Sequence, residues 1–269
     1  MKTQIGAGVV ISMVALACAT AIEPAIAAET SMRLSTGLEY SSGTYGGEED
    51  IEELYVPLTF NMNTDRIGFS VSVPYISVRA PSGTVTDGQA VPGEGDITTQ
   101  SGLGDITANL TVYDVYYNAN LDFALDVTGA IKIGTADFDK GLGTGENDYS
   151  LYLDGYKWFD GFTLMGSLGY RLRGEPAGVD LNNVLVASVG GSWPAGETSS
   201  LGIFFDSRES ALEGHDDIQE LMAFGSFGLS EHWYMQLYAY TGFTDSSTDW
   251  GGGFTITTDV RRPPSRDSF

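Results

Sequence analysis

Two histidines and a series of charged residues at alternating positions are the side chains of this chain that could do chemistry. His215 stands beside Asp216 and Asp217, and a histidine oriented by a carboxylate is a common general base in hydrolases. A solvated histidine in an acidic loop is the simpler interpretation of the same triplet. His232 falls in a segment expected to be a short turn. We therefore expect no catalytic residue and no enzymatic activity.

The sequence contains no other motif for catalysis or ligand binding. It has no phosphate-binding loop, no dinucleotide fingerprint and no set of ligands with metal spacing. The acidic segment 137–141 is too short and too sparse for a calcium loop. The one cysteine, Cys18, lies in an apolar N-terminal segment. The sequence therefore predicts no cofactor, no metal site and no thiol chemistry.

The charged residues recur within short segments that alternate apolar and polar positions. Successive side chains of a β-strand point to opposite faces, so the polar positions of each segment share one face. Counting in steps of two places the following residues on that face: Glu39, Tyr55, Asp122, Asp126, Lys132, Asp154, Arg171, Arg173, Asp206, Arg208, Glu220, Gln236 and Tyr238. Opposite charges on an enclosed face either form salt bridges that fill the interior or line a polar path, and the sequence leaves both interpretations open.

About twelve such segments follow one another from residue 32 to residue 260. The segment 121–133 is the clearest, with Leu125 and Val127 on one face and Asp126 and Thr128 on the other. Short connections alternate with long ones along the chain. The short ones are Asn63-Thr64-Asp65, Tyr116-Tyr117-Asn118-Ala119-Asn120, Asp160-Gly161, Pro194-Ala195-Gly196 and Ser230-Glu231-His232, and one long connection is the Gly/Pro/Thr-rich loop 80–104.

This rhythm predicts an all-β fold, a closed antiparallel transmembrane β-barrel with long extracellular loops and short periplasmic turns. Closure removes the sheet edges, whose backbone groups lipid cannot satisfy. A mean hydropathy of -0.05 suits a barrel, because lipid-facing and lumen-facing residues cancel. A half-buried sheet of a soluble protein is the alternative. Aromatic residues near segment ends suit the interfacial girdles of a barrel: Tyr40, Tyr75, Tyr116, Trp158, Trp193, Trp233 and Trp250.

The two ends of the chain differ from the barrel segments. Residues 1–27 combine a positive start, an apolar stretch and the small-residue site Ala25-Ile26-Ala27, which predicts a cleaved signal peptide. Lipidation at Cys18 is the alternative. We expect the barrel to occupy residues 28–262. A short polar extension, residues 263–269, begins with two prolines that break any strand leading to Phe269.

The charge of the chain limits its partners. With 36 acidic and 13 basic residues the formal net charge is -23, and so acidic a chain repels nucleic acid. An exported barrel belongs in the outer membrane of a Gram-negative cell. The expected partners are therefore outer-membrane lipid, the barrel-assembly machinery and a small-molecule solute that the sequence does not identify.

Two glycine-rich segments are specific enough to indicate a family. Ser101-Gly102-Leu103-Gly104-Asp105 precedes one strand, and Lys132-Ile133-Gly134-Thr135 is followed by Leu142-Gly143-Thr144-Gly145 and Asp148-Tyr149. These segments resemble the meta-pathway phenol-degradation transporter family of outer-membrane barrels, in which proline usually stands at the position of Gly134. The resemblance implies a barrel for the passage of small, often aromatic or hydrophobic compounds.

The motif residues themselves have two interpretations. Gly102, Gly104, Gly143 and Gly145 allow sharp bends where a loop meets a strand, and Asp105 and Asp148 can accept backbone N–H groups there. These six residues either form corners that shape the barrel or form a gate at its lip. For the whole protein we expect a passive channel or uptake protein for small organic molecules. The alternative is a structural or surface-interaction barrel with a closed lumen.

Overall fold

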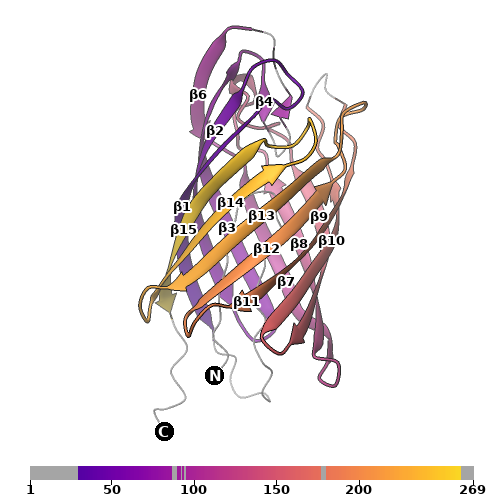
Figure 1. Ribbon diagram of the computed structural model, residues 1–269. Helices are drawn as coiled ribbons and strands as arrows, with labels where there is room; N and C mark the ends of the chain where they lie inside the picture. Colours follow the sequence, from indigo (N-terminus) through magenta and orange to yellow (C-terminus); the bar gives the residue numbers. More distant parts are fainter. Residues whose placement is uncertain (1–29, 87–89, 92, 94, 177–179, 262–269) are drawn as a thin grey trace.

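Strand pairing joins the two ends of the described chain. The structure is a computed structural model that describes residues 30–86, 90–91, 93, 95–176 and 180–261. The first strand, β1 (Ser31–Gly43), pairs antiparallel with the last, β15 (Trp250–Arg261), and neighbouring strands pair antiparallel around the whole sheet. The sheet therefore closes on itself, which confirms the predicted antiparallel β-barrel (Figure 1).

Twelve strands of the described residues form the barrel wall, as the sequence predicts. Between β1 and β15 the wall consists of β2 (Ile51–Asn63), β3 (Ile67–Pro81), β7 (Ile106–Asn118), β8 (Phe123–Ile133), β9 (Asp148–Phe159), β10 (Phe162–Leu172), β11 (Val184–Pro194), β12 (Ser199–Arg208), β13 (Ile218–Gly228) and β14 (Trp233–Gly242).

The connections differ between the two ends of the barrel (Figure 1). At the end where β1 begins and β15 finishes they are short, and we call it the turn end. Its connections are 64–66, 119–122, 160–161, 195–198 and 229–232. We call the opposite end the loop end. Its connections are 44–50, 82–96, 134–147, 173–183, 209–217 and 243–249.

Residues 80–104 are not the continuous loop that the sequence predicts. The strand β6 (Ile97–Leu103) pairs with the outer half of β3, and the short strands β4 (Val85–Thr86) and β5 (Ala90–Val91) pair with each other. The pairing of β7 with β3 stops at Thr107 opposite Ser72, so the outer half of β3 would otherwise expose unpaired backbone groups. Strand β6 satisfies those groups and extends the wall beyond β7.

The two faces of each strand follow the predicted alternation. On β1, Leu34 and Leu38 are 39% and 40% exposed on the outer face, whereas Ser35 and Glu39 are 5% and 7% exposed on the inner face. Leucine, valine, isoleucine and aromatic side chains cover the outer face of the other strands as well. This continuous apolar exterior is what a barrel presents to lipid.

Two details of the turn end differ from the sequence analysis. Trp158 is not a girdle residue, because it packs against buried inner-wall side chains and stacks on Tyr156. Strand β7 continues through Tyr116 and Tyr117 to Asn118, so the turn comprises residues 119–122. Tyr75, Tyr116, Trp193, Trp233 and Trp250 are exposed at the positions expected of girdle residues.

Two further observations bound the fold. Among the described residues, no helix is long and apolar enough to cross a membrane. The predicted signal peptide (1–27), with Cys18, and the predicted C-terminal extension (263–269) lie outside the described residues.

Candidate functional site

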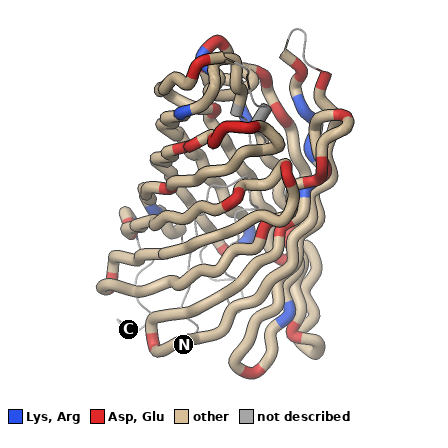
Figure 2. Tube along the Cα trace, turned by 45° about the horizontal axis from the view of Figure 1, so that its top comes forward, with Lys and Arg blue, Asp and Glu red and all other residues tan. Residues whose placement is uncertain are grey.

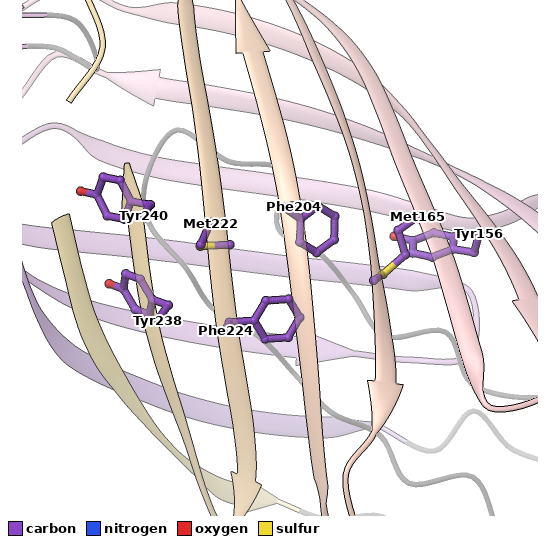
Figure 3. Packing of buried hydrophobic residues seen from close by; sticks show 7 residues of the cluster. All are labelled: Tyr156, Met165, Phe204, Met222, Phe224, Tyr238 and Tyr240. Atoms are coloured by element: carbon purple, nitrogen blue, oxygen red, sulfur yellow. The ribbon is translucent and has the colours of Figure 1, made fainter. Parts of the chain in front are cut away.

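A row of large apolar side chains crosses the inner wall. Tyr240 on β14 pairs with Met222 on β13, which pairs with Phe204 on β12. Strand β11 contributes a glycine to the same ladder, followed by Met165 on β10 and Tyr156 on β9. All five side chains are buried, and Figure 3 shows them following one another across the strands. We call these five residues the apolar row.

Aromatic rings of the inner wall lie against glycines of the neighbouring strand. A Cβ added to Gly202 would stand less than 3.0 Å from the ring of Phe224, which flanks the apolar row (Figure 3). The same holds for Gly190 beneath the ring of Phe204. The Phe204 and Phe224 rings stack with centroids 5.9 Å apart. The absence of a side chain at these glycines lets the rings rest on the wall instead of projecting across the lumen.

A second row of inner-wall residues runs beside the apolar row, one inward-facing position closer to the loop end. Its residues are opposite one another on successive strands: Glu220 with Asp206, Asp206 with Ser188, Ser188 with Ser167, Ser167 with Asp154, and Asp154 with Asp126. We call these six residues the acceptor row. Glu220 lies near the loop-end terminus of β13 and Asp126 near the turn-end terminus of β8, so the row crosses the wall diagonally.

Three of the four carboxylates of the acceptor row accept hydrogen bonds from neutral donors. Asp154 accepts from the hydroxyls of Thr128, at 3.0 Å, and Ser167, at 2.6 Å. Asp126 Oδ1 accepts from the backbone N–H of Asp114 at 2.7 Å. Glu220 Oε1 accepts from a backbone N–H of loop 243–249 at 3.2 Å. These bonds fix the carboxylates on the inner wall.

Arg208 is the cation between the two carboxylates nearest the loop end. Its Nε lies 3.7 Å from Asp206 Oδ1 and its Nη2 lies 3.8 Å from Glu220 Oε2. Asp206 Oδ2 and Glu220 Oε2 are buried and have no hydrogen-bond partner within the part of the chain that the structure describes. Two acceptor atoms with unused hydrogen-bonding capacity therefore lie buried within the inner wall.

Glu39 stands near the end of the apolar row on β1. The Tyr238 hydroxyl donates to Glu39 Oε2 at 2.6 Å and the Tyr240 hydroxyl donates to Oε1 at 2.8 Å. Tyr55 is opposite Glu39 in the β1–β2 ladder and is half-buried. The apolar row thus ends in a carboxylate held by two phenols.

The two motif segments meet around Lys132 near the loop end. Lys132 Nζ lies 3.3 Å from Asp105 Oδ2 and 3.4 Å from Asp148 Oδ2, and it donates to Thr144 Oγ1 at 3.0 Å. Arg173 Nε lies 3.8 Å from Asp148 Oδ2. We call these five residues the mouth cluster. Its charged side chains are 13% exposed or less, which makes them a buried ion-pair network.

The mouth cluster anchors the loop 134–147, which we call the mouth loop. Leu142 and Ala136 of this loop are buried against Ile51, Ile76 and Val78 on the inner wall. The backbone N–H of Ala136 donates to Asp105 Oδ1 at 2.8 Å. The loop also contains the 3₁₀ turn η1 (Phe138–Lys140). The mouth loop therefore folds inward, over the inner wall of β2 and β3.

The glycines of the two motifs stand where this packing leaves no room. A Cβ on Gly143 would approach Asp105 Oδ2 to 2.8 Å, and a Cβ on Gly104 would strike the Ile76 side chain. Gly102 faces the Leu142 side chain. Gly145 has a φ of 69°, a conformation that favours glycine. Asp148 Oδ1 accepts the backbone N–H of the residue after Arg173 at 3.0 Å.

The structure brings together most of the residues that the sequence analysis selected. The acceptor row contains Asp126, Asp154, Asp206 and Glu220, and Arg208 lies beside it. A second group, across β1, β2 and β14, consists of Glu39, Tyr55 and Tyr238. The mouth cluster includes Lys132 and Arg173. Arg171 donates to the Tyr152 hydroxyl at 3.3 Å on the inner wall. Gln236 is buried and donates to a serine of β13 at 3.4 Å.

The prediction that Asp122 faces the lumen is wrong. Asp122 is exposed and lies in the turn 119–122, with a φ of 45°, because β8 begins only at Phe123. Alternation assigned it the inward parity, but a turn residue has no sheet face. His215 is also exposed, and its Nδ1 contacts the backbone oxygen of Glu213 at 3.3 Å.

The apolar row was absent from the predicted lumen residues. Its signal lies in segments where apolar residues occupy both faces of a strand, such as Ile203-Phe204-Phe205 and Leu221-Met222-Ala223-Phe224. A barrel wall with a polar lumen does not require such runs. An apolar residue between two lipid-facing ones therefore indicates an apolar patch on the inner wall.

The chain matches one protein family and resembles several solved structures. Residues 35–259 match the family model described as "Putative MetA-pathway of phenol degradation". A comparison with curated proteins finds no match. Similar solved structures include an outer-membrane channel from Pseudomonas putida F1, with a TM-score of 0.70 at 11% identity, covering 89% of this chain and 100% of that one. The NanC porin matches with a TM-score of 0.57 at 6% identity, covering 84% and 100%. The KdgM porin matches with a TM-score of 0.50 at 10% identity, covering 85% and 99%.

At these identities the similar structures establish the fold, which is that of outer-membrane β-barrels. The family match spans most of the barrel, from β1 to β15, and confirms the resemblance drawn from the two glycine-rich segments. The chain belongs to the family of the "Putative MetA-pathway of phenol degradation" proteins.

Proposed function

We propose that this protein is a passive outer-membrane channel for small organic molecules, in particular hydrophobic and aromatic ones. The apolar row is the observation that carries the proposal. Aromatic rings and thioethers on an inner wall form no strong hydrogen bonds with water. The transfer of an apolar solute from water onto such side chains is favourable. A barrel that served only as a scaffold would not need Phe204, Met222 and Met165 in a continuous line from β9 to β14.

The relatives support the same proposal. The family description refers to the degradation of phenol, which is a small aromatic compound. Proteins named as channels or porins share the fold. In a passive channel the solute moves along its concentration gradient. Export through the signal peptide 1–27, with residues 28–262 as the barrel, is part of the proposal. Mass spectrometry of the mature protein tests it by showing a start at Ala28 or a lipidated Cys18.

A barrel with a closed lumen is the second candidate, because the interior is tightly filled. Tyr156, Met165 and Glu220 are 2%, 3% and 1% exposed on the inner wall, and the mouth loop covers part of the loop end. Side chains that fill a barrel of this size leave room for at most a narrow path. The two candidates make opposite predictions for current through a lipid bilayer.

Reconstitution in a planar bilayer is the test. We expect discrete current steps from the purified protein, and transient blockades of these steps when benzyl alcohol is added. A gel comparison of unboiled and boiled samples first establishes that the barrel is folded, because a closed barrel migrates differently until heat unfolds it. A folded barrel that stays silent in the bilayer would favour the closed lumen and contradict the proposal.

Replacing Phe204 with serine tests the apolar row directly. We expect Phe204→Ser to shorten the benzyl alcohol blockades by about two- to tenfold, because an aromatic contact contributes roughly 0.5–1.5 kcal/mol. Phe205→Ser is the matched control, since Phe205 is adjacent in sequence but has the opposite parity and contacts the Phe243 ring. Equal blockade times in both variants would show that the solute does not contact the apolar row.

A further inference from the structure

The apolar row and the acceptor row form one continuous strip of the inner wall, which is apolar along one edge and acidic along the other. They run side by side across five strands, β9 to β13, and each strand contributes one inward residue to each row or a glycine in its place. Successive residues on one face of a strand stand about 6.8 Å apart. A solute with an aromatic ring and a polar arm of one or two carbons spans that distance, with its ring on one row and its polar end on the other.

The acceptor row is short of positive charge. It contains four buried carboxylates, those of Asp126, Asp154, Asp206 and Glu220, and the carboxylates of Glu39 and Glu53 lie near its loop-end part. Among the described residues, Arg208 and Arg171 are the cations that lie against this row. Two guanidinium groups do not balance the carboxylates, so the inner wall along the rows carries an excess of negative charge.

The unused acceptor atoms indicate the chemistry of the missing partner. Asp206 Oδ2 and Glu220 Oε2 are oxygens of side chains that are 2% and 1% exposed, and neither accepts a hydrogen bond within the described residues. Leaving a buried acceptor unsatisfied is unfavourable. An ammonium group offers three N–H donors and a positive charge, whereas a carboxylate offers no donor and adds to the repulsion.

The rings beside these oxygens favour the same class of solute. Phe204 is the inward-facing neighbour of Asp206 on β12, and Met222 is the inward-facing neighbour of Glu220 on β13. Tyr240 is opposite Met222. An aromatic face attracts a cation, and the attraction grows when water is excluded. The site therefore combines carboxylate oxygens and aromatic faces, the two groups with which proteins bind organic ammonium ions.

The loop end adds a long-range contribution. Figure 2 shows acidic residues along the loops at the loop end. The connections 44–50, 134–147, 209–217 and 243–249 include Glu48, Glu49, Asp50, Asp137, Asp139, Asp216, Asp217 and Asp245. A predominantly acidic rim raises the local concentration of a positively charged solute. The rim and the acceptor row thus act in the same direction, from the loop end toward the turn end.

We infer that the two rows form a binding track for aromatic solutes with a positively charged ammonium arm, and that the same track excludes aromatic carboxylates. The inference rests on the proposed function, because the track lies in the lumen of the proposed channel. The inference narrows the solute class from small aromatic molecules in general to those whose polar end is cationic. Aromatic solutes with a neutral hydrogen-bond donor should bind the track more weakly.

Permeability ratios in a planar bilayer test the inference. Benzylammonium and benzoate have the same ring and nearly the same size but opposite charge, and the reversal potential in a gradient of each salt gives its permeability. We expect the channel to pass benzylammonium at least about tenfold better than benzoate. Equal permeabilities, or a preference for benzoate, would overturn the inference.

Neutralising the row should remove the preference. We expect the ratio of benzylammonium to benzoate permeability to fall severalfold in Asp206→Asn. Asp206 pairs with Arg208, so its substitution could also disturb folding. Asp154→Asn is therefore a second variant, because the Asp154 carboxylate accepts hydrogen bonds from the Thr128 and Ser167 hydroxyls and its substitution breaks no ion pair among the described residues. Asp160→Asn is the matched control, since Asp160 is exposed in the turn 160–161. An unchanged ratio in both row variants would overturn the inference.

The outcomes also separate this inference from the proposed function. A wild-type barrel that conducts and is blocked by benzyl alcohol, yet does not distinguish the two ions, retains the proposed function and overturns only the inference. A folded barrel without current overturns both.

Discussion

Replacing Lys132 with methionine should release the mouth loop from the inner wall and increase the current through the barrel. The Lys132 ammonium lies between the Asp105 and Asp148 carboxylates and also donates to Thr144 in the loop. Methionine has a similar length and no charge, so the two carboxylates would lose the cation between them. Removing one partner of a buried ion pair costs about 3–5 kcal/mol.

The lost ion-pair energy should destabilise the mouth loop more than the strands. Asp105 holds the loop by accepting the Ala136 N–H, and the strand pairing of β8 with β7 and β9 continues to the level of Lys132 without the lysine side chain. A loss of about 3 kcal/mol would raise the population of the released loop by roughly 100-fold. The loop residue Leu142 would leave the inner wall, and the opening at the loop end would widen.

Trypsin measures that release, because Lys140 lies in the loop. Cleavage of a transiently opened segment follows the population of the open form, so we expect cleavage after Lys140 to accelerate by about 100-fold in Lys132→Met. Asp137→Asn is the matched control: it breaks the exposed Asp137–Lys140 pair of the same loop, which contributes about 0–1 kcal/mol. If Lys132→Met and Asp137→Asn show the same cleavage rate and the same current, the mouth cluster does not hold the loop.

Alternation along the sequence was sufficient for the fold and for the face of most residues. Strand counting placed Glu39, Asp126, Asp206 and Glu220 on the inner wall because a half-buried strand has a strict period of two. The same rule failed at Asp122, since the pattern continues past the point where β8 begins and a turn has no inner face. It also missed β6, whose side chains are mostly exposed and show little contrast between faces.

Alternation does not predict which inward-facing residues are neighbours on adjacent strands. Alternation fixes a residue's face, but the ladder register depends on where each strand pairs with the next. The contiguity of Tyr156, Met165, Phe204, Met222 and Tyr240 becomes visible only when the registers of β9 to β14 are known. The acceptor row requires the same knowledge, since its carboxylates come from strands far apart in the sequence.

The mouth cluster illustrates a different limit. The sequence analysis connected Gly102-Leu103-Gly104-Asp105 and the segments around Lys132 and Asp148 through a family resemblance. It assigned Lys132 to the lumen and the two aspartates to loop corners. In the structure Lys132 pairs with both aspartates. Long-range contacts between a strand residue and two loop ends have no periodic signal in a single sequence, so their meeting point could not be inferred.

Replacing Gly202 with alanine should close the solute path without removing any functional side chain. A Cβ at this position would stand less than 3.0 Å from the Phe224 ring, so the ring must leave the wall and turn into the lumen. Forcing extra atoms into a packed site costs about 1–3 kcal/mol. We therefore expect the barrel to remain folded but to show a smaller current.

The double variant Gly202→Ala/Phe224→Ala distinguishes this mechanism from a general loss of stability. With the ring removed, the alanine Cβ keeps only a 2.9 Å approach to the backbone oxygen of Gly191, so we expect most of the current to recover. Two contacting residues give such non-additive effects, whereas independent ones do not. Gly129→Ala is the control, because a Cβ at Gly129 meets nothing within 4 Å and should leave current and stability unchanged. A current that falls further in the double variant would mean that Phe224 supports the wall and does not obstruct the path when displaced.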